Sequence, residues 1–182
     1  MLKWIIATLV ILIAAPFVIV GSWLATEGML QATADEPFCG ICHTMTPFVT
    51  THEADVHGGS NARGLVAKCT DCHLPHDSNW AYLTEKARSG LHDVWGQLTH
   101  WVGLNKIDWE AKLAERDSFV FDSGCRHCHA ALDREDNPRY AIHSRYFSAN
   151  GSLKCVTCHR TVGHHELAEA LKGPADKDQA PD

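Results

Sequence analysis

The sequence predicts a mainly α-helical protein with much coil, made of one N-terminal transmembrane helix and a small domain without a conventional core. Three observations lead to this fold class. The chain begins with a long uncharged apolar run, all eight cysteines fall in one repeated motif, and a helical apolar pattern separates two pairs of these motifs. The expected segments are an anchor over 1–30, a domain over 31–172 and a flexible tail over 173–182.

The apolar run extends from Trp4 to Leu24 and contains no charged residue. About 20 apolar residues cross a hydrocarbon core of roughly 30 Å when they are helical. Lys3, before the run, favours a cytoplasmic N-terminus and export of everything downstream. The alternative is a cleaved signal peptide, because Ala32-Thr33-Ala34 provides an Ala-x-Ala pattern. The run exceeds the roughly 7–15 residues of a signal peptide's apolar region, so we expect an uncleaved anchor.

Four copies of Cys-x-x-Cys-His account for every cysteine in the chain. This spacing lets two thiols add to the two vinyl groups of one haem, and it brings the next histidine to the iron. A single Cys-x-x-Cys also suits zinc or a redox disulfide, but four copies, each followed by histidine, favour covalent haem. The sequence therefore predicts a tetrahaem c-type cytochrome that carries electrons. The attachment residues are Cys39, Cys42, Cys69, Cys72, Cys125, Cys128, Cys155 and Cys158.

Four haems in so short a domain leave too little side-chain surface for an ordinary core, so we expect the haem faces to form it. The formal net charge is −6 and no basic stripe is present, which argues against a nucleic-acid partner. Because haem is attached outside the bacterial cytoplasm and every cysteine is committed, the domain is expected on the exported side of the membrane.

The motifs form two pairs, since Cys39 and Cys69 are separated by 30 residues and so are Cys125 and Cys155. Equal spacing suggests an internal duplication of a dihaem unit. The two halves would span about 31–78 and 120–172, joined by helices within 79–119.

Two helices are expected in the connecting segment. Apolar residues recur at three- and four-residue steps over 79–105, as in an amphipathic helix. Trp95 and Trp101 of this helix either cover haem faces or lie along the membrane surface, and the pattern does not separate these readings. A second helix is expected over 108–121, with Asp108 as its N-cap and Glu110 in its first turn.

Each iron needs axial ligands besides the attachment site. The motif histidines are His43, His73, His129 and His159. Among the other nine, His57, His143 and His164 lie near the motifs and are the candidate distal ligands. His127 is tied between two cysteines and is expected to face solvent. Surface or haem-propionate contacts are expected for His52, His92, His100 and His165.

The first motif is unusual because Met45 follows His43 after one residue. A thioether is a soft donor that can bind iron. Two residues of chain do not reach around a haem, so His43 and Met45 do not bind opposite faces of one iron. The other face then takes another donor or stays open for chemistry.

These features together resemble the NapC/NirT family of membrane-anchored tetrahaem quinol dehydrogenases. The resemblance rests on the anchor, the four motifs, the Cys-x-x-Cys-His-x-Met form of the first motif, and His73-Leu-Pro-His76 at the second. Within the family, the first motif and the short chain are most like NrfH, the small subunit of cytochrome c nitrite reductase.

The resemblance implies a quinol dehydrogenase of the bacterial inner membrane that takes electrons from menaquinol or ubiquinol. Its four periplasmic haems would feed a multihaem reductase in anaerobic respiration, with cytochrome c nitrite reductase favoured, and the chain would work as a possible homo-oligomer within a larger complex. The alternatives are a NapC-like donor to nitrate or another terminal reductase, and a quinone-reducing cytochrome that runs in reverse.

The resemblance also implies roles for particular residues. Met45 would bind the iron of haem 1, the haem of the first motif, in place of His43. Lys86 and Asp93, seven residues apart on the following helix, would border the quinol site. The distal ligands of haems 2, 3 and 4 would be His164, His57 and His143, in that order, opposite the motif histidines His73, His129 and His159.

Overall fold

The computed structural model describes residues 1–172, and the flexible tail expected over 173–182 lies outside them. Helices and loops make up the described residues, which contain no β-strand and one isolated bridge between Gly58 and Val66. The elements are α1 (Leu2–Ala32), η1 (His43–Met45), α2 (Thr46–Glu53), α3 (Cys69–His73), α4 (Asn79–Trp101), α5 (Trp109–Ala114), η2 (Arg116–Ser118), α6 (Asp122–Cys128), η3 (Ala130–Asp133), α7 (Tyr140–Ser148), α8 (Cys155–Cys158) and α9 (Leu167–Ala170). The predicted mainly helical fold class is confirmed.

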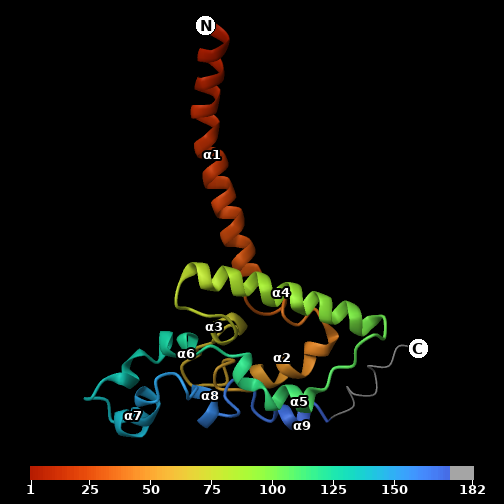
Figure 1. Cartoon of the computed structure of the whole chain (residues 1–182), viewed down its shortest axis with the longest axis vertical. Coiled ribbons are helices and arrows are strands. Elements are labelled where there is room, and N and C mark those ends of the chain that lie inside the picture. The colour runs from red at the N-terminus through yellow and green to blue at the C-terminus, as the bar shows by residue number, and fades with distance from the viewer. Residues whose placement is uncertain (173–182) are drawn as a thin grey trace.

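The N-terminal helix α1 projects away from the rest of the protein as a single rod (Figure 1). It is long and apolar enough to cross a membrane, with a mean hydropathy of 2.6 over its most apolar window, and none of that window is buried in the protein. The helix continues through Pro16 and ends at Ala32, eight residues beyond the apolar run. The Ala-x-Ala pattern thus begins in the last turn of a continuous helix.

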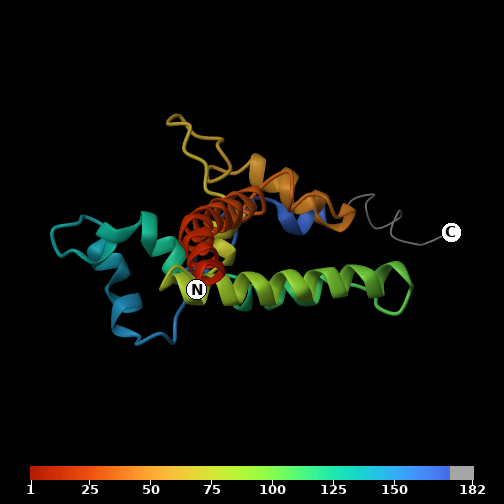
Figure 2. The same cartoon turned by 90° about the horizontal axis from the view of Figure 1, so that it is seen from above.

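Helix α4 lies crosswise at the foot of α1, so the two helices are close to perpendicular (Figures 1 and 2). Ser78 caps its N-terminus, because the Ser78 hydroxyl accepts a hydrogen bond of 3.1 Å from the N–H of Ala81. The ammonium of Lys86 joins the two helices by donating to the carbonyls of Leu30 (3.1 Å) and Thr33 (3.0 Å). These carbonyls belong to the last turn of α1 and to its C-cap residue, where a cation is favoured.

Below α4, the domain separates into two groups of short helices (Figure 1). One group contains α2, α5 and α9, with α2 packed on α9, and the other contains α6, η3 and α7. Helices α3 and α6 form the seam between them, and Gly124 allows their close approach. A Cβ atom at Gly124 would lie 1.9 Å from the carbonyl oxygen of Asp71.

Very little of the polypeptide is buried. The buried apolar residues among those described are Ala34, Leu74, Val156 and Leu167, and no large side chain is fully enclosed. Roughly 60% burial of chain surface is usual even for a 60-residue domain. Side chains alone therefore do not form the core of this domain, in agreement with a core built from haem.

The helix expected over 108–121 is shorter in the structure. Its predicted N-cap is confirmed, because Asp108 accepts from the N–H of Ala111 at 2.9 Å, but α5 ends at Ala114. The backbone after it is committed to other partners: the Phe119 carbonyl contacts the His73 ring at 2.8 Å, and the Phe121 N–H donates to the Cys72 carbonyl at 3.0 Å. These long-range bonds replace helical ones, and a sequence pattern does not reveal them. Helix α4 likewise ends at Trp101, earlier than the expected 105.

Candidate functional site

The four cysteine motifs adopt related local structures. The second motif is α3 and the fourth begins as α8, whereas the third closes α6 and the first forms a turn that leads into η1. All eight cysteines are unpaired and none is fully buried. Every thiol is therefore available for covalent attachment, and no disulfide competes for it.

Three histidine pairs face one another with nearly equal separation. The ring centres are 6.1 Å apart for His73 and His164, 6.3 Å for His57 and His129, and 6.3 Å for His143 and His159. A metal–nitrogen bond of about 2 Å places two imidazoles on opposite sides of one iron with ring centres roughly 6 Å apart. Each pair contains one motif histidine and one of the candidate distal ligands. The geometry therefore fits an iron held between the two rings.

The outward nitrogens of the candidate ligands are already held by the protein. Nδ1 of His164 contacts the Phe48 carbonyl at 3.0 Å, and Nδ1 of His143 contacts the Arg139 carbonyl at 2.9 Å. Nδ1 of His57 contacts Asp55 Oδ1 at 3.1 Å. Ligating histidines commonly donate their second N–H in this way, which fixes the ring and leaves Nε2 for the metal. Burial lowers the pKa of His164 to about 4, so this ring stays neutral, as ligation requires.

The position of His57 depends on the glycine after it. A Cβ atom at Gly58 would lie 1.8 Å from the carbonyl oxygen of His52, so only glycine lets this loop pack against α2. His52 links two backbone segments by hydrogen bonds and is not a surface residue. Its two ring nitrogens contact the carbonyls of Gly163 (3.0 Å) and Ala67 (2.9 Å), which leaves neither for a metal. His127 is exposed, as expected.

A buried hydrogen-bond donor without an acceptor also supports the presence of a cofactor. The indole N–H of Trp109 is enclosed and has no hydrogen-bond partner within the described residues. Its ring lies 5.0 Å from Phe48, which in turn contacts His164 with ring centres 5.8 Å apart. Native proteins rarely leave such a donor unpaired. A haem propionate near His164 would supply the acceptor, so the residues present fit this cofactor.

The first motif lacks the arrangement of the other three. Within residues 1–172, no second histidine ring faces His43, which is exposed, and Met45 is half-buried. Thr44, between them, donates to Gln97 of α4 at 2.9 Å. The first motif therefore lies against α4, near the foot of α1.

Lys86, Asp93 and Gln97 lie on one side of α4. At about 100° per residue they fall within roughly 40° of one another. Lys86 is engaged with the carbonyls at the end of α1, whereas the Asp93 side chain is 78% exposed and pairs with its neighbour His92 at 3.4 Å. The structure does not pair Lys86 with Asp93. Gln97 was missed from the sequence, although its position four residues after Asp93 was the available signal.

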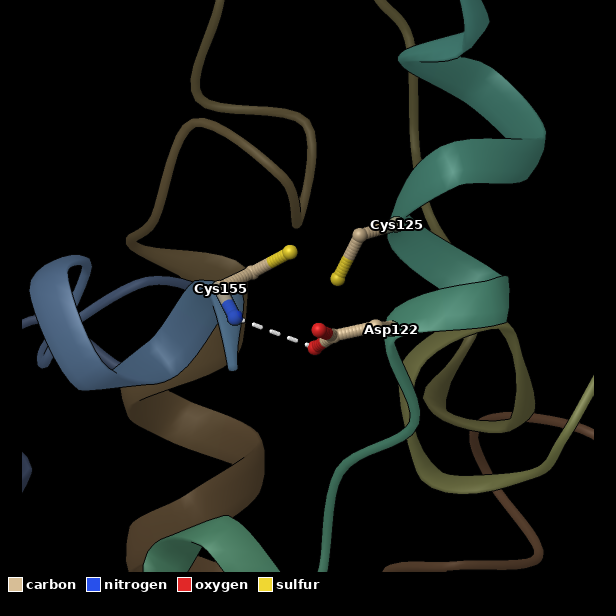
Figure 3. A group of neighbouring side chains, drawn as sticks. All are labelled: Asp122, Cys125 and Cys155. Carbon is tan, nitrogen blue, oxygen red and sulfur yellow. Dashed lines mark hydrogen bonds between the residues drawn. The ribbon is translucent and has the colours of Figure 1, made fainter. Parts of the chain in front are cut away.

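Cysteines of neighbouring motifs meet beside an aspartate. Figure 3 shows Cys125 of the third motif and Cys155 of the fourth with their sulfurs directed toward one another above Asp122. One ligand atom from each of these three residues lies within 4.8 Å of the others. The pKa of the Cys125 thiol is lowered to about 7, chiefly by a hydrogen bond from Cys155, whose own pKa is raised. Two of the three groups are attachment cysteines of different motifs, so the cluster belongs to the haem sites and not to a separate metal ion.

A model of the NapC/NirT cytochrome c family, N-terminal region, matches residues 2–169. Similar proteins include the cytochrome c-type protein NapC of Paracoccus pantotrophus (31% identity, covering 78% of this chain and 63% of that protein). The tetraheme c-type cytochrome CymA of Shewanella oneidensis is 29% identical over 86% of this chain and 89% of its own length. This chain thus spans less than two thirds of NapC but most of CymA.

One solved structure is similar over nearly the whole chain. It is the cytochrome c nitrite reductase NrfHA complex bound to the HQNO inhibitor, in which one chain matches with a TM-score of 0.54 and 26% identity. The match covers 95% of this chain and 99% of that one. The agreement includes the N-terminal helix as well as the domain that carries the four motifs.

Proposed function

The chain belongs to the NapC/NirT cytochrome c family, and on that basis we propose that it is a membrane quinol dehydrogenase. It oxidises menaquinol or ubiquinol and delivers the electrons to a periplasmic reductase. The observation that carries the proposal is the difference between the motifs. Three motif histidines face a second histidine, whereas the first motif has no such partner in the part of the chain that the structure describes and lies against α4 at the foot of the apolar helix.

The histidine pairs support the ligand assignment. His73 and His164 would hold the second haem, His129 and His57 the third, and His159 and His143 the fourth. Met45 would hold the first in place of His43. When bound, the four haems supply one-electron carriers with potentials set by these ligands and by burial. A cytochrome with one differently ligated, membrane-proximal haem suits entry of electrons at that end.

The residues that accept protons from the quinol lie on the face of α4 that carries Lys86 and Asp93. Quinol oxidation releases two protons, so an exposed carboxylate at the site accepts them and passes them to solvent. Asp93 has this exposure. An ammonium has three N–H donors, and Lys86 uses two on the carbonyls of α1, which leaves one to orient a quinol hydroxyl.

The outer side of α4 supports access from the bilayer. Its exposed apolar residues centre roughly 110° around the helix from Lys86, at about 100° per residue. They are Trp80, Leu83, Leu91, Val94, Trp95, Leu98 and Trp101, of which Trp80 is 77% and Leu91 74% exposed. The centre of this stripe lies about 90° around the helix from Gln97, which contacts the first motif, and Trp95 lies about 160° from Gln97, which favours the membrane-surface reading for Trp95. Trp101 lies about 40° from Gln97, so both readings stay open for it. Helix α4 then lies in the headgroup layer beside a vertical α1.

The direction of insertion follows from charge. Lys3 precedes the apolar helix, and Glu27, Asp35 and Glu36 follow it, which favours a cytoplasmic N-terminus. The haem domain is then periplasmic and the protein is a single-pass protein of the inner membrane.

The partner we favour is cytochrome c nitrite reductase, because a chain of the NrfHA complex is similar over almost the full length. His143 faces His159 within this chain, so the fourth haem needs no ligand from a partner. The alternative is a NapC-like donor to another reductase, favoured by the similarity to NapC and CymA. Affinity purification from membranes followed by mass spectrometry separates them: a stable multihaem partner supports nitrite reductase, and a molybdoenzyme in its place rejects it.

The quinol site is tested with Asp93→Asn in the full-length, membrane-bound protein. Oxidation of a menaquinol analogue should slow by 10-fold or more, on the order of one general-base contribution, while haem content and spectra are unchanged. The matched control is Glu85→Gln on the same helix, whose carboxylate is paired with Arg88 at 2.6 Å and lies away from the Lys86 face. Equal turnover in Asp93→Asn and the control would reject Asp93 as the proton acceptor.

A further inference from the structure

An aspartate stands in the same place in each half of the domain. Asp35 Oδ1 accepts the backbone N–H of Cys69 at 3.2 Å, and Asp122 Oδ1 accepts that of Cys155 at 3.1 Å. Each aspartate precedes the first motif of its half, and each of these cysteines begins the second motif. The N–H groups at the start of a helix have no intrahelical acceptor, so each carboxylate satisfies a donor that α3 or α8 leaves free.

The same carboxylates lie against the sulfur atoms. The Cys69 thiol donates to Asp35 Oδ1 at 3.2 Å, and Asp122 lies within 4.8 Å of the sulfurs of both Cys125 and Cys155 (Figure 3). The second oxygen of Asp122 is fixed by the Tyr146 hydroxyl at 2.8 Å. In the second half the carboxylate therefore holds a cysteine of one motif beside a cysteine of the other. In the first half the thiols of Cys39 and Cys69 share a side-chain hydrogen bond, so the same two motif positions meet beside Asp35.

The segment that leads to each aspartate is also held in the same way. The Lys86 ammonium donates to the carbonyls of residues 30 and 33, five and two positions before Asp35. The Lys154 ammonium donates to the carbonyls of residues 117 and 120, five and two positions before Asp122. The end of α1 and the η2 segment differ in sequence. In both, a lysine ammonium binds two backbone carbonyls, and the aspartate follows at the same distance along the chain.

We infer that Asp35 and Asp122 are positioning residues for haem attachment, each holding the first cysteine of one motif beside the first cysteine of its neighbour. The attachment sulfurs of the two motifs in a half would then lie side by side. In each attachment an S–C bond forms to one vinyl carbon and the thiol hydrogen passes to the other, so no oxidant is consumed. This role concerns attachment and spacing, and it does not depend on the quinol activity.

The first experiment compares Asp122→Ala, Asp122→Asn and the control Asp136→Ala, an exposed carboxylate paired with Arg134. Intact mass and pyridine haemochrome give haems per chain, and alkylation with peptide mapping locates unreacted thiols. Asp122→Ala should lower the four-haem fraction at least fivefold, with free thiols at the third and fourth motifs. Asp122→Asn retains an oxygen acceptor and should keep four haems. The control should match the wild-type protein.

The Asn variant has a second readout that a purely structural role would not change. Removing a negative charge beside two sulfurs favours the reduced, less positive iron, so the potentials of the two second-half haems should rise in Asp122→Asn. Asp35→Ala and Asp35→Asn should give the same pair of results in the first half. Four haems in both Ala variants, or haem loss scattered evenly over all motifs, would overturn the assignment, as would Asn variants that behave like Ala.

Discussion

In the first half of the haem domain, residues 31–78, Asp35 holds Cys69, and in the second half, residues 120–172, Asp122 holds Cys155. The halves differ in where their other groups come from. Lys154 lies next to the cysteine that its half positions, whereas the corresponding ammonium of the first half, Lys86, comes from α4. The lysine that holds the backbone of the first half therefore lies on α4, the helix that contacts the membrane anchor.

The histidines of the two halves also differ in whether the ring that each faces belongs to its own half. His57 and His143 are 86 residues apart, the same offset that separates the motif histidines of the two halves. His143 faces His159 of its own half, but His57 faces His129 of the other half. The first half receives His164 from the C-terminal segment instead. Positions at the same offset from the motifs therefore face rings in different halves, and the two halves are interlaced.

The largest expected effect is at the seam between the halves. In Gly124→Ala the new methyl group would overlap the Asp71 carbonyl, so α3 and α6 must separate. We expect a loss of about 1–3 kcal/mol or more of unfolding free energy and a fall in haem content. Thermal unfolding followed by Soret absorbance measures the first, and pyridine haemochrome the second. Gly90→Ala, with no atom within 4 Å, is the control and should be neutral or stabilising by up to about 1 kcal/mol.

The crossing of ligands is tested next. His57→Ala, His143→Ala and His164→Ala should each convert one low-spin haem to high spin, as seen by near-infrared magnetic circular dichroism. The spectral change in His57→Ala should match that in His129→Ala, its partner across the halves, and differ from that in His143→Ala. If His57→Ala instead matches His73→Ala, the halves are not interlaced.

A smaller effect is expected at the two lysines. Lys154→Met and Lys86→Met each remove charged hydrogen bonds to two carbonyls, worth roughly 1–3 kcal/mol of unfolding free energy. Lys154→Met should leave quinol oxidation unchanged, whereas Lys86→Met should slow it. The control is Lys112→Met, which removes an exposed pair with Glu115 worth about 0–1 kcal/mol. Equal turnover in all three variants would show that Lys86 only fastens α4 to the anchor.

The smallest effect concerns a single haem. Met45→Leu should change the spectrum and potential of the first haem alone and leave the three histidine-paired haems as they are. Met29→Leu, a 60% exposed position in α1, is the matched control and should change none. Electron paramagnetic resonance with a potentiometric titration resolves the four signals. A change in two or more haems in Met45→Leu would contradict the assignment of Met45.

Local patterns were sufficient for the fold class. The apolar run predicts α1, and Asp108 predicts the start of α5, because membrane spanning and helix capping depend on neighbouring residues only. The end of α5 was predicted wrongly, since the carbonyls of residues 117–120 bind Lys154 and His73, which are distant in sequence. Asp35 and Asp122 were missed for the same reason. Their place before a motif was visible, but the cysteine each contacts lies 33 or 34 residues away.

The axial ligands could be predicted only in part from local patterns. His57, His143 and His164 could be chosen from the sequence because few histidines remain once the motifs are counted, and the resemblance to the family suggested the pairing. Spacing alone does not pair them, because His57 is nearer in sequence to His73 than to His129, the ring that it faces. Ring-to-ring distances support the pairing, and the spectroscopic variants test it.

The interlaced histidines also bear on how the protein is made. In synthesis from the N-terminus the second motif emerges early, but His164, whose ring faces that of His73, is among the last described residues to follow. The third motif, by contrast, meets His57 when it arrives. The pair of rings at the second motif is therefore the last of the three to be completed, after the pair at the fourth motif. A chain that ended before residue 164 would leave His73 without the ring that faces it, although all four motifs would be present.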